Sequence, residues 1–199
     1  MIELKRETTE TKIYLKLDLY GEGNYDIKTG IGFFDHMLEL WSRHGFFDLE
    51  LKVEGDLEVD DHHTVEDTGI MLGKAINKEL GNRAGIKRYA DIILPMDETL
   101  LMTAVDLGGK SYYKSDFSFS RNEVGGFAVE LVDEFFRSLV SHGKLNLHFS
   151  QIRGENTHHI AEGAFKAFAR ALDKATDPEK RLKDKPLSTK GQLQEGGRH

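Results

Sequence analysis

Two pairs of adjacent histidines, each followed by a glutamate, are the residues of this sequence best suited to chemistry. His62 and His63 lie in DDHHTVEDTG (60–69), and a second pair lies in GENTHHIAEG (154–163). The chain has no cysteine, which excludes disulfides and thiolate metal sites. Imidazole with carboxylate suits manganese, zinc or iron, and several carboxylates favour octahedral manganese. The spacing is not HExxH, so a metallopeptidase is not expected.

Helix geometry assigns the two histidines of a pair to different ions. Neighbouring residues on a helix project about 100° apart, so His62 and His63 cannot easily bind the same metal. Glu66 follows His62 by four residues and lies on the same face. An ion held by His62 and Glu66 therefore leaves His63 for a second ion. The same geometry applies to His158, His159 and Glu162.

Both histidine pairs are expected at the N-terminus of a helix. Asp61 and Thr157 immediately precede the pairs and are expected to cap these helices. The helix dipole disfavours cations at this end, so ligand carboxylates must offset it. The simpler interpretation is that such histidines are satisfied by hydrogen bonds, and a single motif favours it. Two motifs at equivalent places in a duplicated chain favour metal binding instead.

Periodic patterns place each pair within a repeated series of elements. The first half is expected to form strands at 2–7 and 12–19, a short strand within 21–30, a helix at 32–45, a strand at 46–55 and a helix at 61–80. The second half follows with strands at 86–98, 100–109 and 111–120, a helix at 127–143, a strand at 144–154 and a helix at 156–176. The expected helix stops are Gly45, Gly81 and Gly143.

The two halves also match residue by residue. Aligning 35–51 with 133–149 places His36 opposite Glu134 and His44 opposite His142. We therefore predict an α+β fold of two duplicated β-β-β-α-β-α half-domains packed with pseudo-twofold symmetry. The predicted divisions of this one compact unit are a first half-repeat at 1–84, a second at 85–180, and a C-terminal substrate-binding segment and tail at 181–199.

Composition narrows the class of protein. Hydrophobic residues make up 39% of the 199 residues, enough for a packed core. No apolar run approaches the roughly 20 residues that span a membrane, and the polar residues 1–10 resemble neither a signal nor a transit peptide. The net charge of −7 argues against general nucleic-acid binding. The basic stretch 179–191 is either a solvated tail or a binding segment.

Four motifs, in order, resemble those of imidazoleglycerol-phosphate dehydratase, an enzyme family of histidine biosynthesis. They are GIGFFDHML (30–38), DDHHTVEDTGI (60–70), GENTHHIAEGAFKAFARAL (154–172) and STKG (188–191). The resemblance extends from about Glu7 to Gly191, nearly the whole chain. It implies a hydro-lyase on a duplicated fold of the ribosomal protein S5 domain 2-like type.

The resemblance implies two manganese ions in each active site. One ion would be held by His36, His63, His158 and Glu162, and the other by His62, Glu66, Glu134 and His159. The repeat exchanges these two sets and separates adjacent histidines, as the helix geometry requires. Some relatives carry histidine at position 134, where this chain has Glu134, still a competent ligand.

The reaction that the resemblance implies is the loss of water from imidazoleglycerol phosphate, giving imidazoleacetol phosphate. The proton to be removed lies next to no carbonyl and is therefore barely acidic. We hypothesise that metals on the two ring nitrogens favour the imidazolate, whose electrons expel the hydroxyl beside the ring. The metals would act as Lewis acids and as a template.

The resemblance also assigns a proton carrier and a phosphate site. Proton transfer at that carbon requires a carboxylate, and the family pattern points to Glu10, with Glu162 as the second candidate. From the residues alone, Glu10 is a surface glutamate at a strand turn. The family positions for substrate and phosphate binding are Glu10, Arg88, Lys110, Ser188, Thr189 and Lys190. Many relatives carry arginine at position 110, so Lys110 replaces a bidentate clamp with a point charge.

Three alternative functions stay open at the level of sequence. A two-metal phosphohydrolase would use its ions to activate water, although such sites usually contain several aspartates. A nucleic-acid-binding module fits duplicated small α+β units but not the acidic charge. A metal-storage or structural oligomer leaves the STKG motif and Glu10 without a role.

The resemblance finally implies how the chain is assembled and where it acts. The family forms a homo-oligomer of 24 chains with active sites between subunits. A small phosphate substrate is the expected partner, with neither nucleic acid nor membrane. A cytoplasmic location fits the absence of cysteine.

Overall fold

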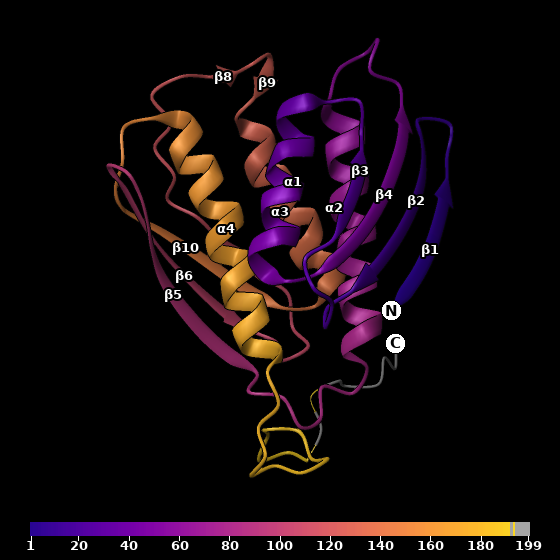
Figure 1. Ribbon diagram of the computed structural model, residues 1–199, viewed down its shortest axis with the longest axis vertical. Helices are drawn as coiled ribbons and strands as arrows, with labels where there is room; N and C mark the ends of the chain where they lie inside the picture. Colours follow the sequence, from indigo (N-terminus) through magenta and orange to yellow (C-terminus); the bar gives the residue numbers. More distant parts are fainter. Residues whose placement is uncertain (192, 194–199) are drawn as a thin grey trace.

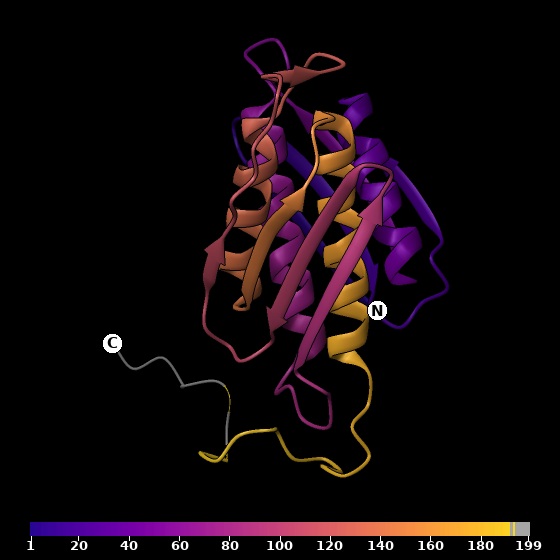
Figure 2. The same cartoon turned by 90° about the vertical axis from the view of Figure 1, so that its left-hand side faces the viewer.

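Two four-stranded sheets enclose a layer of helices in the computed structural model, which describes residues 1–191 and 193 (Figure 1). A view from the side shows the second sheet in front of the helices and the first behind them (Figure 2). Helix α2 packs on strands of the first sheet and α4 on strands of the second. Across the middle of the molecule, α2 contacts α3 and α1 contacts α4.

The first repeat contains one sheet and two helices. Its elements are β1 (Ile2–Glu7), β2 (Thr11–Asp18), β3 (Tyr25–Lys28), α1 (Gly32–Gly45), β4 (Asp48–Gly55) and α2 (His62–Leu80). The strand order is β1-β2-β4-β3. Strands β1–β2 and β2–β4 pair antiparallel, whereas β3–β4 pair in parallel.

The second repeat has the same topology. Its elements are β5 (Tyr89–Met96), β6 (Thr99–Asp106), β7 (Tyr112–Lys114), β8 (Glu123–Val124), β9 (Phe127–Ala128), α3 (Glu130–Gly143), β10 (Asn146–Arg153) and α4 (Thr157–Thr176). The order β5-β6-β10-β7 has the same pattern of antiparallel and parallel pairs as the first sheet. The predicted duplicated α+β fold is therefore confirmed. The predicted divisions at 84/85 and 180/181 stay a prediction, and residues 192 and 194–199 of the tail lie outside the described residues.

Each sheet buries one face, and α4 buries most of its residues. In β2, Ile13, Leu15 and Leu17 point into the core and alternate with more exposed residues, as expected for a sheet covered on one side. Helix α4 lies between a sheet and α1, which explains why alanines such as Ala164 and Ala167 are buried beside large side chains. Close packing of this helical layer joins the two repeats.

The segment before α3 differs from the expected structure. A third strand was expected over 111–120, but β7 covers only Tyr112–Lys114. The expected helix at 127–143 begins at Glu130, because β9 pairs with β8 in a short hairpin. Gly125 and Gly126 form its turn with φ of 61° and 85°, conformations that favour glycine. Apolar residues at helical spacing predict a helix from residue 127, which is why this turn was not predicted.

Two of the three expected glycine helix stops act by a different mechanism. Helices α1 and α3 end on Gly45 and Gly143, but the left-handed residues that follow are Phe46 and Lys144, with φ of 58° and 50°. A Cβ at Gly45 would lie 2.1 Å from the Phe47 ring, so the glycine is needed for space. Gly81 does take positive φ at the end of α2, as expected.

The expected helix caps are also corrected. Asp61 lies at the N-cap of α2, but its side chain makes no capping bond, and Asp60 accepts from the His62 N–H instead. The N-cap of α4 is Asn156, whose side chain accepts from the His158 and His159 N–H groups. Thr157 is one residue inside the helix and was wrongly expected to cap it.

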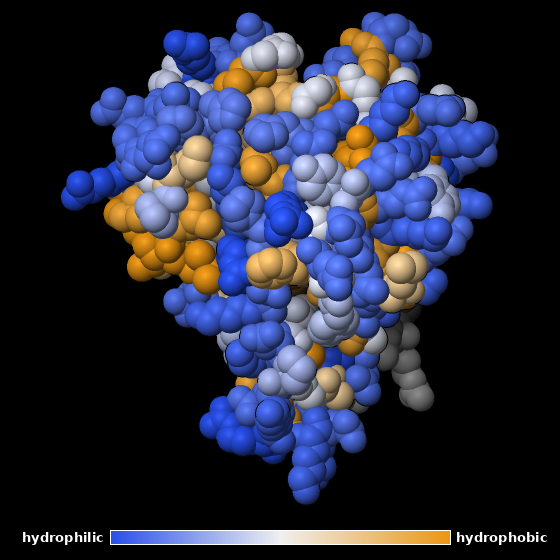
Figure 3. Space-filling model, viewed as in Figure 1, coloured by the Kyte–Doolittle hydropathy of each residue, from blue (hydrophilic) through white to orange (hydrophobic). Residues whose placement is uncertain are grey.

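Apolar side chains remain on the outer face of the second sheet. Ile93, Met102 and Ile152 are 61%, 39% and 48% exposed, and Ile93 pairs directly with Met102 across β5 and β6. Figure 3 shows apolar surface at the left of the molecule, over this sheet. Among the described residues, no helix has the length and apolar character needed to cross a membrane.

At Gly73, where the backbones of α2 and α3 lie close together, helix α2 should tolerate no side chain. A Cβ at Gly73 would lie 2.3 Å from the Leu139 carbonyl oxygen and 2.8 Å from the Gly143 nitrogen. We expect Gly73→Ala to lower the free energy of unfolding by about 1–3 kcal/mol, because overpacking must displace backbone. Denaturation followed by circular dichroism measures this. Gly32→Ala is the control, since its Cβ meets nothing within 4 Å; equal effects of the two changes would contradict the account.

Candidate functional site

Three predicted ligands converge where α1 meets α4. His158 and Glu162 lie one turn apart at the start of α4, with His158 Nε2 3.1 Å from Glu162 Oε2. His36, near the start of α1, places its Nε2 3.9 Å from the same oxygen. One ligand atom from each lies within 4.8 Å of the others. Two imidazoles and a carboxylate at this separation fit a divalent cation held by nitrogen and oxygen.

The carboxylate of this cluster is the buried member. Glu162 is 7% exposed and forms an ion pair with Lys166, one turn further along α4. Burial raises the pKa of Glu162, but the hydrogen bonds and charges of Lys166 and His158 outweigh it and lower that pKa. Glu162 is thus ionised and ready to bind a cation. His36 and His158 are more exposed and keep the cluster accessible.

The first histidine pair lies at the start of α2. His62 Nε2 is 3.8 Å from Glu66 Oε2, so these two share a face as expected. His63 turns away, with Nδ1 3.0 Å from Asp56 Oδ2 and Nε2 3.9 Å from Glu10 Oε1. The hydrogen bond to Asp56 raises the pKa of His63. The two neighbours therefore have different partners, which agrees with the separation inferred from helix geometry.

The remaining predicted ligands, His159 and Glu134, have other hydrogen-bond partners. His159 Nδ1 is 2.7 Å from Glu98 Oε2, a hydrogen bond that lowers the pKa of Glu98 to about 2 and raises that of His159. Glu134 Oε1 accepts a long, 3.4 Å hydrogen bond from Ser138. Within the described part of one chain, the set of His36, His158 and Glu162 lacks His63, and the set of His62 and Glu66 lacks Glu134 and His159.

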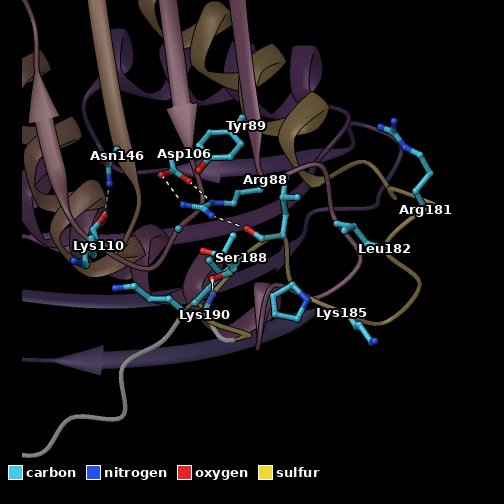
Figure 4. A pocket seen from close by; sticks show the side chains of 15 residues that line it. Arg88, Tyr89, Asp106, Lys110, Asn146, Arg181, Leu182, Lys185, Ser188 and Lys190 are labelled. Atoms are coloured by element: carbon cyan, nitrogen blue, oxygen red, sulfur yellow. Dashed lines mark hydrogen bonds and ion pairs between the residues drawn. The ribbon is translucent and has the colours of Figure 1, made fainter.

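The predicted phosphate residues line one cavity at the opposite end of the molecule. It has a volume of about 960 Å³, and its walls include Arg88, Lys110, Ser188, Thr189 and Lys190. Figure 4 shows Arg88 between the sheet and the C-terminal segment, with Lys110 and Lys190 on one side of it. The fold thus brings three predicted positions near the C-terminus together with two in the second repeat, Arg88 and Lys110, which precede Ser188 by 100 (188 − 88) and 78 (188 − 110) residues.

Arg88 is held firmly in this cavity. Its Nε and Nη2 donate to the two oxygens of Asp106 at 2.7 and 3.1 Å, and Nη1 donates to the Leu187 carbonyl at 2.7 Å. The hydrogen bonds to Asp106 raise the pKa of Arg88. Pro186 forms a β-bridge with Ala84, which fixes the C-terminal segment against the start of the second repeat. A rigid guanidinium beside this segment suits a phosphate.

The cavity and the histidine cluster lie at opposite ends of α4. The Arg88 N–H donates to the carbonyl of Ala175, near the end of the helix. Ala175 follows His158 by 17 residues (175 − 158), which corresponds to about 25 Å of helix. A small phosphate ester cannot contact both places in one chain.

Comparison with known proteins decides the family. A profile described as imidazoleglycerol-phosphate dehydratase matches residues 29–172. The chain belongs to the imidazoleglycerol-phosphate dehydratase family. Its members are hydro-lyases of histidine biosynthesis, so the predicted enzyme class is confirmed. The phosphohydrolase, nucleic-acid-binding and storage alternatives are set aside.

Relatives agree over nearly the full length. Imidazoleglycerol-phosphate dehydratase from Clostridium acetobutylicum is 51% identical over 190 residues, which cover 96% of each chain. One from Cereibacter sphaeroides is 49% identical over 191 residues, 96% of this chain and 98% of its own. The structure of the Staphylococcus aureus dehydratase matches with a TM-score of 0.80 and 36% identity, covering 90% of this chain and 100% of the other. That from Pyrococcus furiosus gives 0.80 and 34%, covering 94% and 99%.

Several partners of the candidate site were not expected from sequence. Asp106 holds Arg88, Asp56 holds His63, Lys166 pairs with Glu162, and Glu98 holds His159. An alignment of the two first hairpins would have found Glu98, since TETK (9–12) and DETL (97–100) both begin their second strand after a glutamate. Lys166 could also have been found, because it follows Glu162 by four residues on the same helix. Asp56 and Asp106 have no such regular spacing from His63 and Arg88.

The C-terminal segment should contribute to substrate binding. We expect truncation before Pro186 to raise the KM for the phosphate substrate about ten- to a hundredfold, since charge-assisted hydrogen bonds contribute about 1.5–3 kcal/mol each. Steady-state kinetics measures KM, and circular dichroism reports the fold. Truncation after Gly191, which keeps Ser188 to Lys190, is the matched control and should change KM far less. An unchanged KM in the chain truncated before Pro186 would show that the segment is only a solvated tail.

Proposed function

We propose that this chain dehydrates imidazoleglycerol phosphate with two divalent cations, manganese in the first instance, in each active site. The convergence of His36, His158 and Glu162 carries the proposal. His63 would complete that ligand set. The second ion would be held by His62, Glu66, Glu134 and His159. When bound, the ions would act as Lewis acids on the imidazole ring and fix its orientation.

Glu10 is the better candidate for moving the proton. Its side chain is half exposed and lies 3.9 Å from His63 Nε2. Glu162 is buried and already contacts Lys166 and His158, which favour its ionised form. A carboxylate that exchanges protons with a substrate must be accessible, and the half-exposed Glu10 is more accessible than the buried Glu162. We therefore assign Glu10 as proton carrier and Glu162 as metal ligand.

The phosphate end of the substrate would bind in the C-terminal cavity. Asp106 holds the Arg88 guanidinium in place, so the cation is oriented before the substrate arrives. Lys110 and Lys190 add point charges, while Ser188 and Thr189 supply hydroxyl groups. Because Lys110 cannot form a bidentate contact, Arg88 is the expected main phosphate anchor.

A complete active site would draw on more than one copy of the chain. The histidine cluster and the cavity are separated by about 25 Å along α4, and the described part of one chain leaves both ligand sets incomplete. The exposed Ile93, Met102 and Ile152 offer an apolar surface for self-association. These observations support the homo-oligomer, 24 chains by resemblance, with sites between subunits. A cytoplasmic location remains part of the proposal.

The metal-dependent activity can be tested with one matched pair of proteins. We expect the manganese-loaded chain to convert imidazoleglycerol phosphate to the ketone product, with two Mn²⁺ bound per chain. Glu162→Gln should lower the bound Mn²⁺ and reduce turnover by at least a hundredfold, because a neutral amide replaces a buried anionic ligand. Elemental analysis measures the metal, and product formation measures turnover. Unchanged Mn²⁺ content in the variant would remove Glu162 from the ligand set, and a folded, loaded wild-type chain without product would refute the function.

A further inference from the structure

The two repeats place equivalent glutamates at the tips of their first hairpins. Glu10 precedes Thr11, the first residue of β2, and Glu98 precedes Thr99, the first residue of β6. Both threonines are buried, 3% and 1% exposed. Each strand has eight residues and ends in aspartate. The duplication therefore makes Glu10 and Glu98 counterparts.

Glu98 is fixed in position by both of its oxygens. Its Oε1 accepts from the backbone N–H of Asn156 at 2.9 Å and of Glu155 at 3.3 Å, and from the Thr99 hydroxyl at 3.0 Å. Its Oε2 lies 2.7 Å from His159 Nδ1. The carboxylate thus joins the β5–β6 turn to the start of α4.

This contact determines the form of the histidine. An ionised carboxylate only accepts hydrogen bonds, so Nδ1 of His159 must carry the proton. In the neutral imidazole, Nε2 then keeps its lone pair, which is the form that binds a metal. Metal-binding histidines commonly donate their second nitrogen to a carboxylate in this way.

The first repeat reaches the same result with a different residue. Asp56, in the loop between β4 and α2, lies 3.0 Å from Nδ1 of His63. Glu10 is therefore not needed there, and it lies on the Nε2 side at 3.9 Å. No hydrogen bond from the described residues holds the Glu10 carboxylate.

We infer that Glu98 is a positioning residue that fixes the Nδ1–H form of His159 and presents Nε2 to a divalent cation. Asp56 takes this role for His63, which leaves the counterpart Glu10 available to exchange protons with the substrate. The inference rests on the proposed metal-ligand role of His159. It explains why two equivalent glutamates have different tasks.

Glu98→Gln tests the inference with little change of shape. The two backbone N–H groups and the Thr99 hydroxyl hold the amide oxygen where Oε1 was, so the NH₂ group faces His159 Nδ1 and donates to it. The ring proton then moves to Nε2 and blocks the metal. We expect the dissociation constant for Mn²⁺ to rise about ten- to a hundredfold, with the melting temperature of the metal-free protein unchanged. The d–d absorption of the Co²⁺-loaded protein should also shift.

Glu10→Gln is the matched control, because it changes the counterpart residue by the same atoms. It should bind Mn²⁺ like the wild-type chain while losing turnover. Wild-type Mn²⁺ affinity in Glu98→Gln would overturn the inference, yet leave the proposed dehydration untouched. If Glu98→Gln lowers the melting temperature, Asp56→Asn gives the same test at His63; wild-type affinity there would equally overturn the inference. Absence of Mn²⁺ binding by the wild-type chain would instead refute the proposed function.

Discussion

The length of the rigid helix α4 determines how far apart the two parts of the candidate site lie. Helix α4 begins at the cluster of His158 and Glu162 and ends beside Arg88, about 25 Å away. Its buried surface, packed against α1 and the second sheet, prevents the two ends from approaching each other. The predicted cation ligands and the predicted phosphate residues are therefore both fixed, and one small substrate cannot reach both within a single chain. The proposed reaction therefore requires self-association.

Duplication provides a symmetric framework that the site uses asymmetrically. Both repeats start a helix with a histidine pair and place a glutamate at the first hairpin. Their chemistry then differs. Asp56 holds His63, whereas Glu98 holds His159, so the counterpart Glu10 keeps a side chain that no hydrogen bond from the described residues holds. In the proposed function, both halves supply metal ligands and only the first half supplies the proton carrier.

Local patterns were sufficient to predict the fold and the spacing within each histidine pair. Alternation and helical periods gave the order of elements, and four-residue spacing placed Glu162 beside His158. Contacts between distant elements could not be predicted in this way. The β8–β9 hairpin was concealed by apolar residues at helical spacing, and Gly45 proved necessary for the Phe47 ring, not for positive φ. The cap at Asn156 was missed by one residue.

We propose that one chain supplies the cation ligands of each active site and another chain supplies its phosphate-binding residues. Co-expression of differently tagged Arg88→Ala and Glu162→Gln chains, followed by purification through both tags, tests it most directly. Each variant alone should be nearly inactive. If the sites lie between subunits, mixed oligomers contain some sites with both residues intact, and turnover is recovered. Mixed oligomers as inactive as either parent would show that Arg88 and Glu162 serve the same chain's site, which contradicts the account.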